Sequence, residues 1–198
     1  MWTLSLVFLL AAAIPLHAEP IASRDRSKAL SYLHATRKMF LDEIAGLSPR
    51  QWTFKPAPDR WSVAECAEHI ALTEEFLWNL IAKTVLTLPP ATAKREVTEA
   101  DDEAVIARMT DRGSPAQAPE PLRPSERFAG PGEVIAAFKE RRDRTTAFIR
   151  DTQEDLRARV SAPPRELDAY QWILMLAAHS ERHTLQIREV KAHPDFPK

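Results

Sequence analysis

Apolar side chains recur along this chain at spacings of three and four residues, which is the period of an α-helix. Alternation of β-branched residues is scarce, and only four glycines occur in the whole chain. The helical pattern predicts four long helices over residues 24–45, 62–87, 131–156 and 168–193. We therefore expect an all-α protein, folded as an antiparallel four-helix bundle over residues 24–193.

Residues with strong end preferences mark where these helices begin and end. Ser62 followed by Glu65 has the spacing of a capping box, and Asp168 with Gln171 forms an approximate capping pair. Gly46 is suited to follow the last turn of the first helix, because glycine adopts the left-handed conformation found there. These positions predict the entry into the second and fourth helices and the exit from the first.

Two connections are rich in proline. Residues 88–131 hold seven prolines and one short amphipathic stretch at 99–109, which predicts a long crossover between helices two and three. A connection of this length could also act as a lid over a site. The loop at 48–60 carries or adjoins Trp52 and Trp61, and we expect such aromatic side chains to cover one end of the core.

The first 18 residues differ in character from the rest. Residues 4–14 form an apolar stretch, and Ala18 offers a small residue at a cleavage edge, which is typical of a secretory signal. The stretch is too short to span a bilayer comfortably, so no stable membrane span is expected after cleavage. The sequence therefore predicts a periplasmic or secreted protein. Positions 2–18 hold no Lys or Arg, which departs from the pattern and leaves an uncleaved anchor or a misassigned start codon open.

Composition is that of an ordinary globular domain, with 44% apolar and 28% charged residues and a net charge of −1. That balance gives no electrostatic footprint for nucleic acid. The run at 139–144 is basic but interrupted by acids, which favours a solvated helix face over an anionic partner. Cys66 is the only cysteine, so no internal disulfide can form.

Three histidines carry the strongest chemical signal. His179 and His183 are spaced i, i+4, which places both rings on one helix face one turn apart. His69 lies on the second helix, in register with Cys66 and the apolar residues Phe76 and Leu80 of that helix. The stripe that His179 and His183 share with core positions contains Trp172, Leu176, Ile187 and Val190. All three imidazoles are therefore expected to face the interior.

Inward-facing imidazoles need partners, because an unsatisfied buried polar group costs about 1–3 kcal/mol. Each could be a core histidine bonded to a carbonyl or carboxylate, but one divalent metal satisfies His69, His179 and His183 together. Three protein ligands with an open position are typical of a reactive metal site. Imidazole ligation suits zinc or nickel first, with iron or copper as alternatives.

Other residues are weaker candidates for the site. Cys66, one turn before His69, is interpreted as a small buried hydrophobe, with a fourth ligand or a nucleophile as alternatives. His34 is an outside candidate and Gln186 a pocket donor. Contacts to the outer nitrogens of the ligand imidazoles could come from three carboxylates, namely Glu65, Glu68 and Glu181.

The segments at 61–70 and 170–187, with the upstream stretch at 47–52, resemble the DinB-like superfamily, which includes DinB/YfiT-type metal-binding bundles. The resemblance implies a four-helix bundle with a long crossover between helices two and three. It also implies a metal triad at His69, His179 and His183, with water completing the coordination. Characterised members include thiol transferases and metal-dependent hydrolases or isomerases.

These observations leave two main functional hypotheses. The first is an exported metal-dependent hydrolase or transferase of a small-molecule substrate, with hydrolysis favoured because low-molecular-weight thiols are mainly intracellular. The second is a non-catalytic bundle that binds a metal or a small ligand, and a purely structural bundle is a third. No catalytic base is evident from the sequence. Bundles of this type often pair through exposed helix faces, so the sequence leaves the oligomeric state open, with a homodimer as one alternative.

Overall fold

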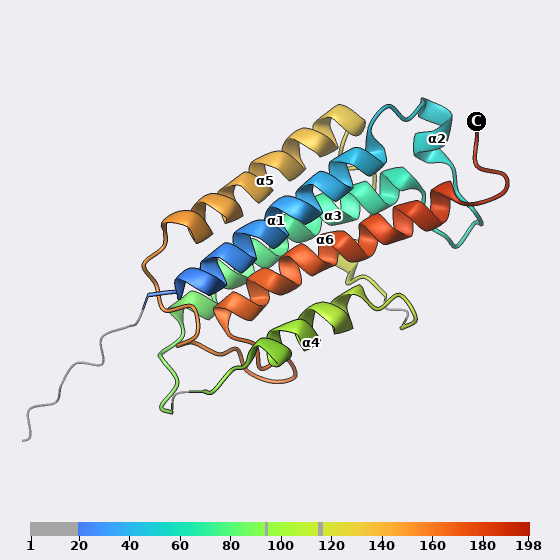
Figure 1. Ribbon diagram of the computed structural model, residues 1–198. Coiled ribbons are helices and arrows are strands. Elements are labelled where there is room, and N and C mark those ends of the chain that lie inside the picture. The colour runs from blue at the N-terminus through green and yellow to red at the C-terminus, as the bar shows by residue number, and fades with distance from the viewer. Residues whose placement is uncertain (1–19, 94, 115–116) are drawn as a thin grey trace, which may run out of the picture.

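The computed structural model describes residues 20–93, 95–114 and 117–198, and the signal sequence expected at 1–18 lies outside these ranges. Four long helices form a bundle (Figure 1). They are α1 (Ser23–Ile44), α3 (Val63–Lys83), α5 (Pro131–Asp151) and α6 (Ala169–Lys191). The described residues contain no strand, so the expected all-α bundle is confirmed.

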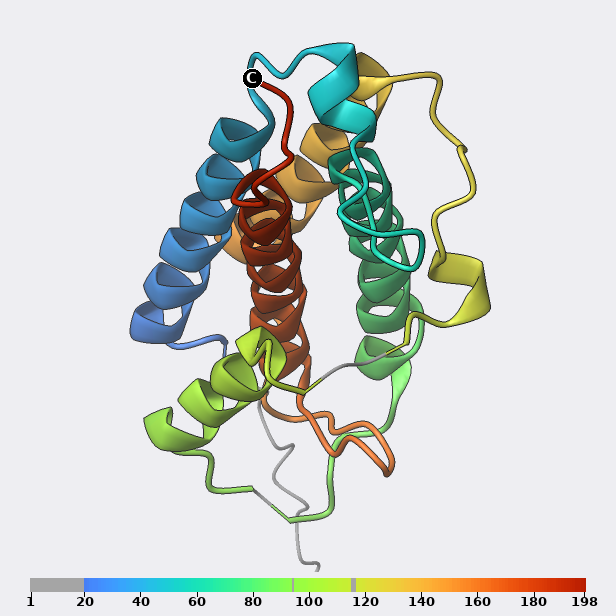
Figure 2. The same ribbon diagram turned by 90° about the vertical axis from the view of Figure 1, so that its right-hand side faces the viewer.

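Two helices of the bundle run in each direction. Helices α1 and α6 run one way, and α3 and α5 run the other way (Figures 1 and 2). Helix α6 packs against α1 and α3, and α5 packs against the same two helices from the far side. Since α3 and α5 are parallel, the chain must return along the whole bundle between them. That distance is about 31 Å for 21 residues of helix, which explains the length of the predicted crossover.

The helix ends follow the predicted caps. Ser62 and Asp168 both form complete capping boxes, with Glu65 and Gln171 respectively. Gly46, just beyond α1, has a positive φ of 68°. The second and third helices are shorter than predicted, ending at Lys83 and at Asp151.

The connections contain four short elements. Helix α2 (Pro49–Thr53) lies in the first loop and was not predicted, although a capping box of Ser48 and Gln51 starts it. A 3-10 turn η1 (Val85–Thr87) follows α3, and another, η2 (Glu120–Leu122), lies late in the crossover. Helix α4 (Glu99–Thr110) confirms the amphipathic stretch of the crossover and packs against α6.

The core consists of two apolar clusters separated by a buried polar layer. One cluster includes Leu33 and Ile173, and the other includes Phe40 and Ile187. Between them lies Arg142, which is fully buried and forms an ion pair with Glu74 of α3. Its guanidinium also donates to the hydroxyl of Thr36 in α1, at 2.7 Å, and to the hydroxyl of Ser180 in α6, at 2.9 Å.

This polar layer corrects the interpretation of residues 139–144 as a solvated helix face. Arg142 has no exposed surface, and Arg141 donates to the carbonyl of Ala71 at 2.7 Å. Arg144 pairs with Glu75 at 2.6 Å. The basic run therefore joins α5 to α3, and α5 turns one of its arginines into the core.

Phe76 corrects a second expectation. Its side chain is 47% exposed, although the sequence placed it on the inner stripe of its helix. Leu77, the next residue, is buried instead. The described residues include no helix that is both long and apolar enough to cross a membrane.

Candidate metal centre

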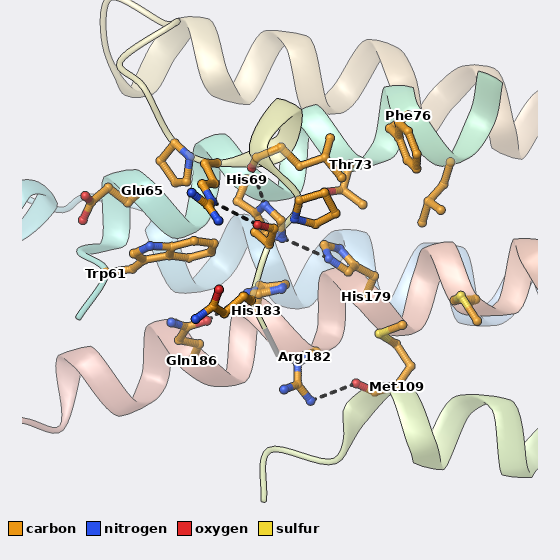
Figure 3. Close-up of a pocket in the computed structure, with 18 of the residues that line it drawn as sticks. Trp61, Glu65, His69, Thr73, Phe76, Met109, His179, Arg182, His183 and Gln186 are labelled. Carbon is orange, nitrogen blue, oxygen red and sulfur yellow. Dashed lines mark hydrogen bonds between the residues drawn. The ribbon is translucent and has the colours of Figure 1, made fainter. Parts of the chain in front are cut away.

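The structure brings the three predicted histidines together. His69 from α3 and His179 and His183 from α6 each offer a ring nitrogen, and these nitrogens lie within 4.8 Å of one another (Figure 3). The Nε2 atoms of His69 and His179 are 3.1 Å apart. The ring centroids of His69 and His183 are 4.4 Å apart. At this spacing one cation could contact all three rings.

Helix geometry accounts for the cluster. His179 and His183 stand one turn apart on α6, so their rings project from the same face. Helix α3 packs antiparallel against that face and carries His69 at the same level (Figures 1 and 3). The sequence separation of 110 residues is thus closed by a single helix–helix contact.

Hydrogen bonds set the tautomers of two of the rings. The Nδ1–H of His69 donates to the backbone carbonyl of Leu122 in η2, at 2.7 Å. The Nδ1–H of His183 donates to the Oε1 of Gln186, at 2.9 Å. Because both acceptors are oxygens, each ring carries its proton on Nδ1 and leaves Nε2 unprotonated. The lone pair of this Nε2 atom is the one that would bind a metal.

The surroundings favour the neutral form of all three imidazoles. Burial lowers the pKa of His69, and the pKa values of His179 and His183 fall well below their ordinary value of 6.5. For His179 the main cause is burial, followed by repulsion from the neighbouring His183 and His69. Neutral imidazole is the protonation state that binds metal.

The donor set fits one divalent cation. Two nitrogens bound to the same tetrahedral zinc at ~2.0–2.1 Å lie about 3.3 Å apart. The observed separation of 3.1 Å between the Nε2 atoms of His69 and His179 is close to that value. Trp61 stacks against the outside of the cluster, with its ring centroid 4.9 Å from that of His69 and 5.9 Å from that of His183.

The triad lines a pocket of about 1000 Å³ between α3 and α6. The crossover covers part of this pocket through η2 and the residues on either side of it. Arg182 of α6 holds the part of the crossover that precedes η2, at the end of α4, by donating to the carbonyls of Met109, Asp111 and Ser114. The site is therefore a sizeable cavity with room for a small molecule beside the histidines.

The structure separates two other sequence candidates from the triad. Cys66 is fully buried in an apolar cluster, and burial raises the pKa of its thiol. It is not part of the histidine group, so the alternatives of a fourth ligand and a nucleophile are not supported, and it packs as a small hydrophobe. His34 is exposed on α1 and lies outside the pocket. Gln186, in contrast, is a pocket residue and orients His183.

The three candidate carboxylates do not contact the outer nitrogens of His69 and His183. Glu65 caps α3 and pairs with Lys55 at 2.9 Å, and Glu181 accepts from Tyr32 at 2.7 Å. Glu68 accepts the backbone N–H groups of residues 125–127. The orienting acceptors are instead the Leu122 carbonyl and Gln186, because α3 and α6 turn these acids toward other segments.

Three residues of the site were not predicted as such. Leu122 acts through its backbone, which no side-chain pattern reveals. Trp61 was predicted to cover the core, and its place directly before the capping box of α3 could have indicated a role near His69. Arg182 follows His179 by three residues, a helical spacing that could have drawn attention to it.

Comparison with known proteins agrees with this architecture. The chain is 26% identical to the uncharacterised protein YuaE of Bacillus subtilis (strain 168) over 164 residues, which is 82% of this chain and 96% of YuaE. Its fold is similar to that of YfiT from Bacillus subtilis, with a TM-score of 0.53 and 16% identity. The match covers 86% of this chain and 88% of YfiT, which is described as a probable metal-dependent hydrolase with an unusual four-helix bundle topology.

A family comparison reaches the same result from the sequence. The sequence model of the DinB superfamily matches residues 32–187. That range contains all three histidines and most of the bundle. The chain belongs to the DinB superfamily.

Proposed function

We propose that this protein is a metal-dependent hydrolase that holds one divalent cation through His69, His179 and His183. The observation that carries the proposal is the convergence of three neutral ring nitrogens within 4.8 Å on the wall of a large pocket. Zinc or nickel suits this ligand set first, and iron or copper are alternatives. The description of YfiT as a probable metal-dependent hydrolase supports the same class of activity.

A divalent cation bound by three neutral imidazoles keeps its full charge and acts as a Lewis acid toward an oxygen of water or substrate. The chain supplies the rest. Leu122 and Gln186 fix the tautomers of two ligands, so those rings need no reorganisation when a cation binds. Trp61 covers the outer side of the cluster and shields it from bulk water on that side.

A non-catalytic metal-binding or small-ligand-binding bundle is the second candidate, and one observation favours it. Two carboxylates of the pocket wall, Glu65 and Glu189, already have cationic partners. Arg112 pairs with Glu189 at 2.7 Å and lowers its pKa. Burial would raise the pKa of Glu65, but hydrogen bonds from Lys55 and Ser62 outweigh it and lower the pKa. Carboxylates held in this way are poor general bases near neutral pH.

Cobalt substitution separates the two candidates from a purely structural bundle. We expect the cobalt-loaded protein to show visible absorption that shifts on addition of azide, because three protein ligands leave a position for an exogenous anion. A zinc-loaded sample would then be screened with ester and amide substrates, beside His183→Ala. Turnover that requires His183 supports the hydrolase. Azide-sensitive absorption without turnover on any substrate supports the metal-binding module. The absence of a cobalt spectrum would contradict both the hydrolase and the metal-binding module.

We further propose that the protein is exported, with cleavage after Ala18. Support comes from the apolar stretch at 4–14 and the small residue at the cleavage edge. Mass spectrometry of the protein recovered from a periplasmic or culture fraction of a bacterial host would test this. A mature chain starting at Glu19 is expected, and a full-length chain confined to the cytoplasm would contradict export.

A further inference from the structure

The pocket around the triad has two chemically different ends. On α6, residues before His179 line one end and residues after His183 line the other. Because α3 runs antiparallel to α6, residues after His69 on α3 lie beside those before His179. The histidines therefore stand at the boundary between the two ends (Figure 3).

One end, which we call the apolar lobe, is lined mainly by hydrophobic side chains. It is formed by Phe76, Leu77, Leu80, Met109, Trp172 and Met175. The other end, which we call the polar lobe, lies beyond His183. It is formed mainly by Arg60, Glu65, Arg112, Gln186 and Glu189. Trp61 and Glu65 lie on the opposite side of the triad from Phe76 and Met109 in Figure 3. The division follows the helix sequences, and it makes the pocket amphipathic.

Phe76 is the feature of the apolar lobe that the fold does not explain. Among the residues that the structure describes, it is the only exposed large hydrophobic side chain. The inner stripe of α3 does not need it, since Leu77 fills that position. An aromatic ring kept exposed on the wall of a pocket, beside a reactive cluster, is typical of a surface that a ligand covers.

The apolar lobe has a defined length. Trp172 and His179 are seven residues apart on α6, which corresponds to about 10 Å. At its far end lies Arg165, whose guanidinium donates to the sulfur of Met175 at 3.4 Å. Two methionines, Met109 and Met175, line the lobe, and their flexible thioethers adapt to the shape of a ligand. The lobe thus has room for a ring or a chain, and not for an extended polymer.

We propose that the site takes a small molecule with one apolar arm, an aryl ring or a medium-length alkyl chain, joined to a polar head. The arm lies in the apolar lobe against Phe76 and Leu80, and the head lies at the histidines. The position of the head rests on the proposed function, whereas the apolar lobe itself does not depend on a metal. The test therefore has a metal-free arm and a metal-loaded arm.

In the metal-free arm, binding of 1-butanol, 1-hexanol and 1-octanol to chelator-treated protein is measured by calorimetry. We expect the dissociation constant to fall about fourfold for each added methylene, which corresponds to ~0.8 kcal/mol per buried CH₂. Phe76→Ala and Leu80→Ala should each weaken octanol binding by about tenfold. Leu72→Ala, a half-buried leucine of the same helix outside the pocket, is the matched control and should leave binding unchanged.

In the metal-loaded arm, acetohydroxamate and octanohydroxamate are bound to the zinc form, since a hydroxamate places two oxygens on a metal. We expect octanohydroxamate to bind far more tightly, and Phe76→Ala to remove most of that advantage without changing acetohydroxamate. Equal affinity for the two hydroxamates, or alcohol binding without dependence on chain length, would overturn the proposal that the substrate has an apolar arm. Length-dependent alcohol binding with no hydroxamate binding would instead contradict the proposed metal site and support ligand binding in the apolar lobe.

Discussion

His69 and His183 each direct one ring nitrogen to an oxygen acceptor and leave the other nitrogen for a cation. The acceptor for His183 is the side chain of Gln186, one turn further along α6. Orienting partners of this kind raise metal affinity because they fix the tautomer and the ring. The ligand positions can be read from helical spacing, and so can Gln186. The carbonyl of Leu122 cannot, because only the folded crossover brings it to His69.

Gln186 offers a direct test at this scale. Gln186→Leu should weaken zinc binding by about 10–100-fold, since the Nδ1–H of His183 loses its acceptor. Competition with a chromophoric chelator would measure the change. Gln186→Glu keeps an oxygen acceptor at the same place and should retain most of the affinity. Equal affinity of wild type and Gln186→Leu would show that the contact does not orient the ligand.

The lowered pKa values of the histidines predict how the metal-free protein responds to acid. Above pH 7 the three rings are neutral in both the folded and the unfolded chain, so they do not change stability. As pH falls below the unfolded value of 6.5, the unfolded chain binds protons that the folded site resists. Stability is then lost until the folded pKa values are passed.

Thermal unfolding of chelator-treated protein between pH 8 and pH 4 measures this loss. We expect a constant Tm near neutral pH and a decline below about pH 6.5. His179→Gln removes one of the two imidazoles whose pKa lies well below 6.5, so the Tm of this variant should decline less steeply. His34→Gln, on the exposed face of α1, should behave as wild type. Parallel curves for wild type and His179→Gln would contradict the buried neutral triad.

At the scale of elements, three of the contacts between the crossover and the bundle involve α3 and α6 residues at or next to the histidines. Arg182 holds its residues 109–114, His69 holds Leu122, and Glu68 accepts the N–H groups of residues 125–127. One of those residues, Glu126, has a positive φ of 60°. The carboxylate of Glu68 thus fixes the turn that follows η2, next to the carbonyl that orients His69.

Replacement of Glu68 should therefore loosen the crossover. Glu68→Leu removes the charged acceptor of three part-buried backbone N–H groups, at a cost of about 1.5–3 kcal/mol in unfolding free energy. Amide hydrogen exchange at residues 125–127 should accelerate, and zinc affinity should fall because Leu122 is released. Glu140→Leu, at an exposed position of α5, is the control. Unchanged exchange in Glu68→Leu would show that the crossover is held by other contacts.

The sequence predicted the elements better than their ends. Capping residues located the starts of α3 and α6 because a capping box is a local interaction. Helix α5 ends earlier than its pattern indicated, at Asp151. At that end, the guanidinium of Arg26 from α1 caps the helix by donating hydrogen bonds to the carbonyls of residues 149, 150 and 152. A partner more than 100 residues away in the sequence leaves no local signal.

For the whole molecule, the buried polar layer decides how the helices are joined. Arg142 of α5 bonds to Glu74 of α3, to Thr36 of α1 and to Ser180 of α6, so one side chain contacts all three other long helices. Ser180 directly follows His179. The same level of the bundle therefore holds both the polar layer and the triad. Sequence patterning misses this, because a charged run on a helix is usually solvated.

Arg142→Met should destabilise the protein by about 3–5 kcal/mol, because Glu74 would be left as an unpaired buried charge. Urea unfolding followed by circular dichroism would measure the change. The double variant Arg142→Met with Glu74→Leu removes both charges and should recover much of the loss. A small effect of the single variant, or no recovery in the double variant, would show that the pair does not hold the bundle together.

Metal content measured by inductively coupled plasma mass spectrometry tests the central claim most directly. Residues 19–198 would be purified without a histidine tag, alongside His179→Ala and the exposed-histidine control His34→Ala. The account predicts about one zinc or nickel ion per chain in wild type and in His34→Ala, and none in His179→Ala. An absence of bound metal in wild type, even after incubation with zinc or nickel, or full retention in His179→Ala, would contradict it.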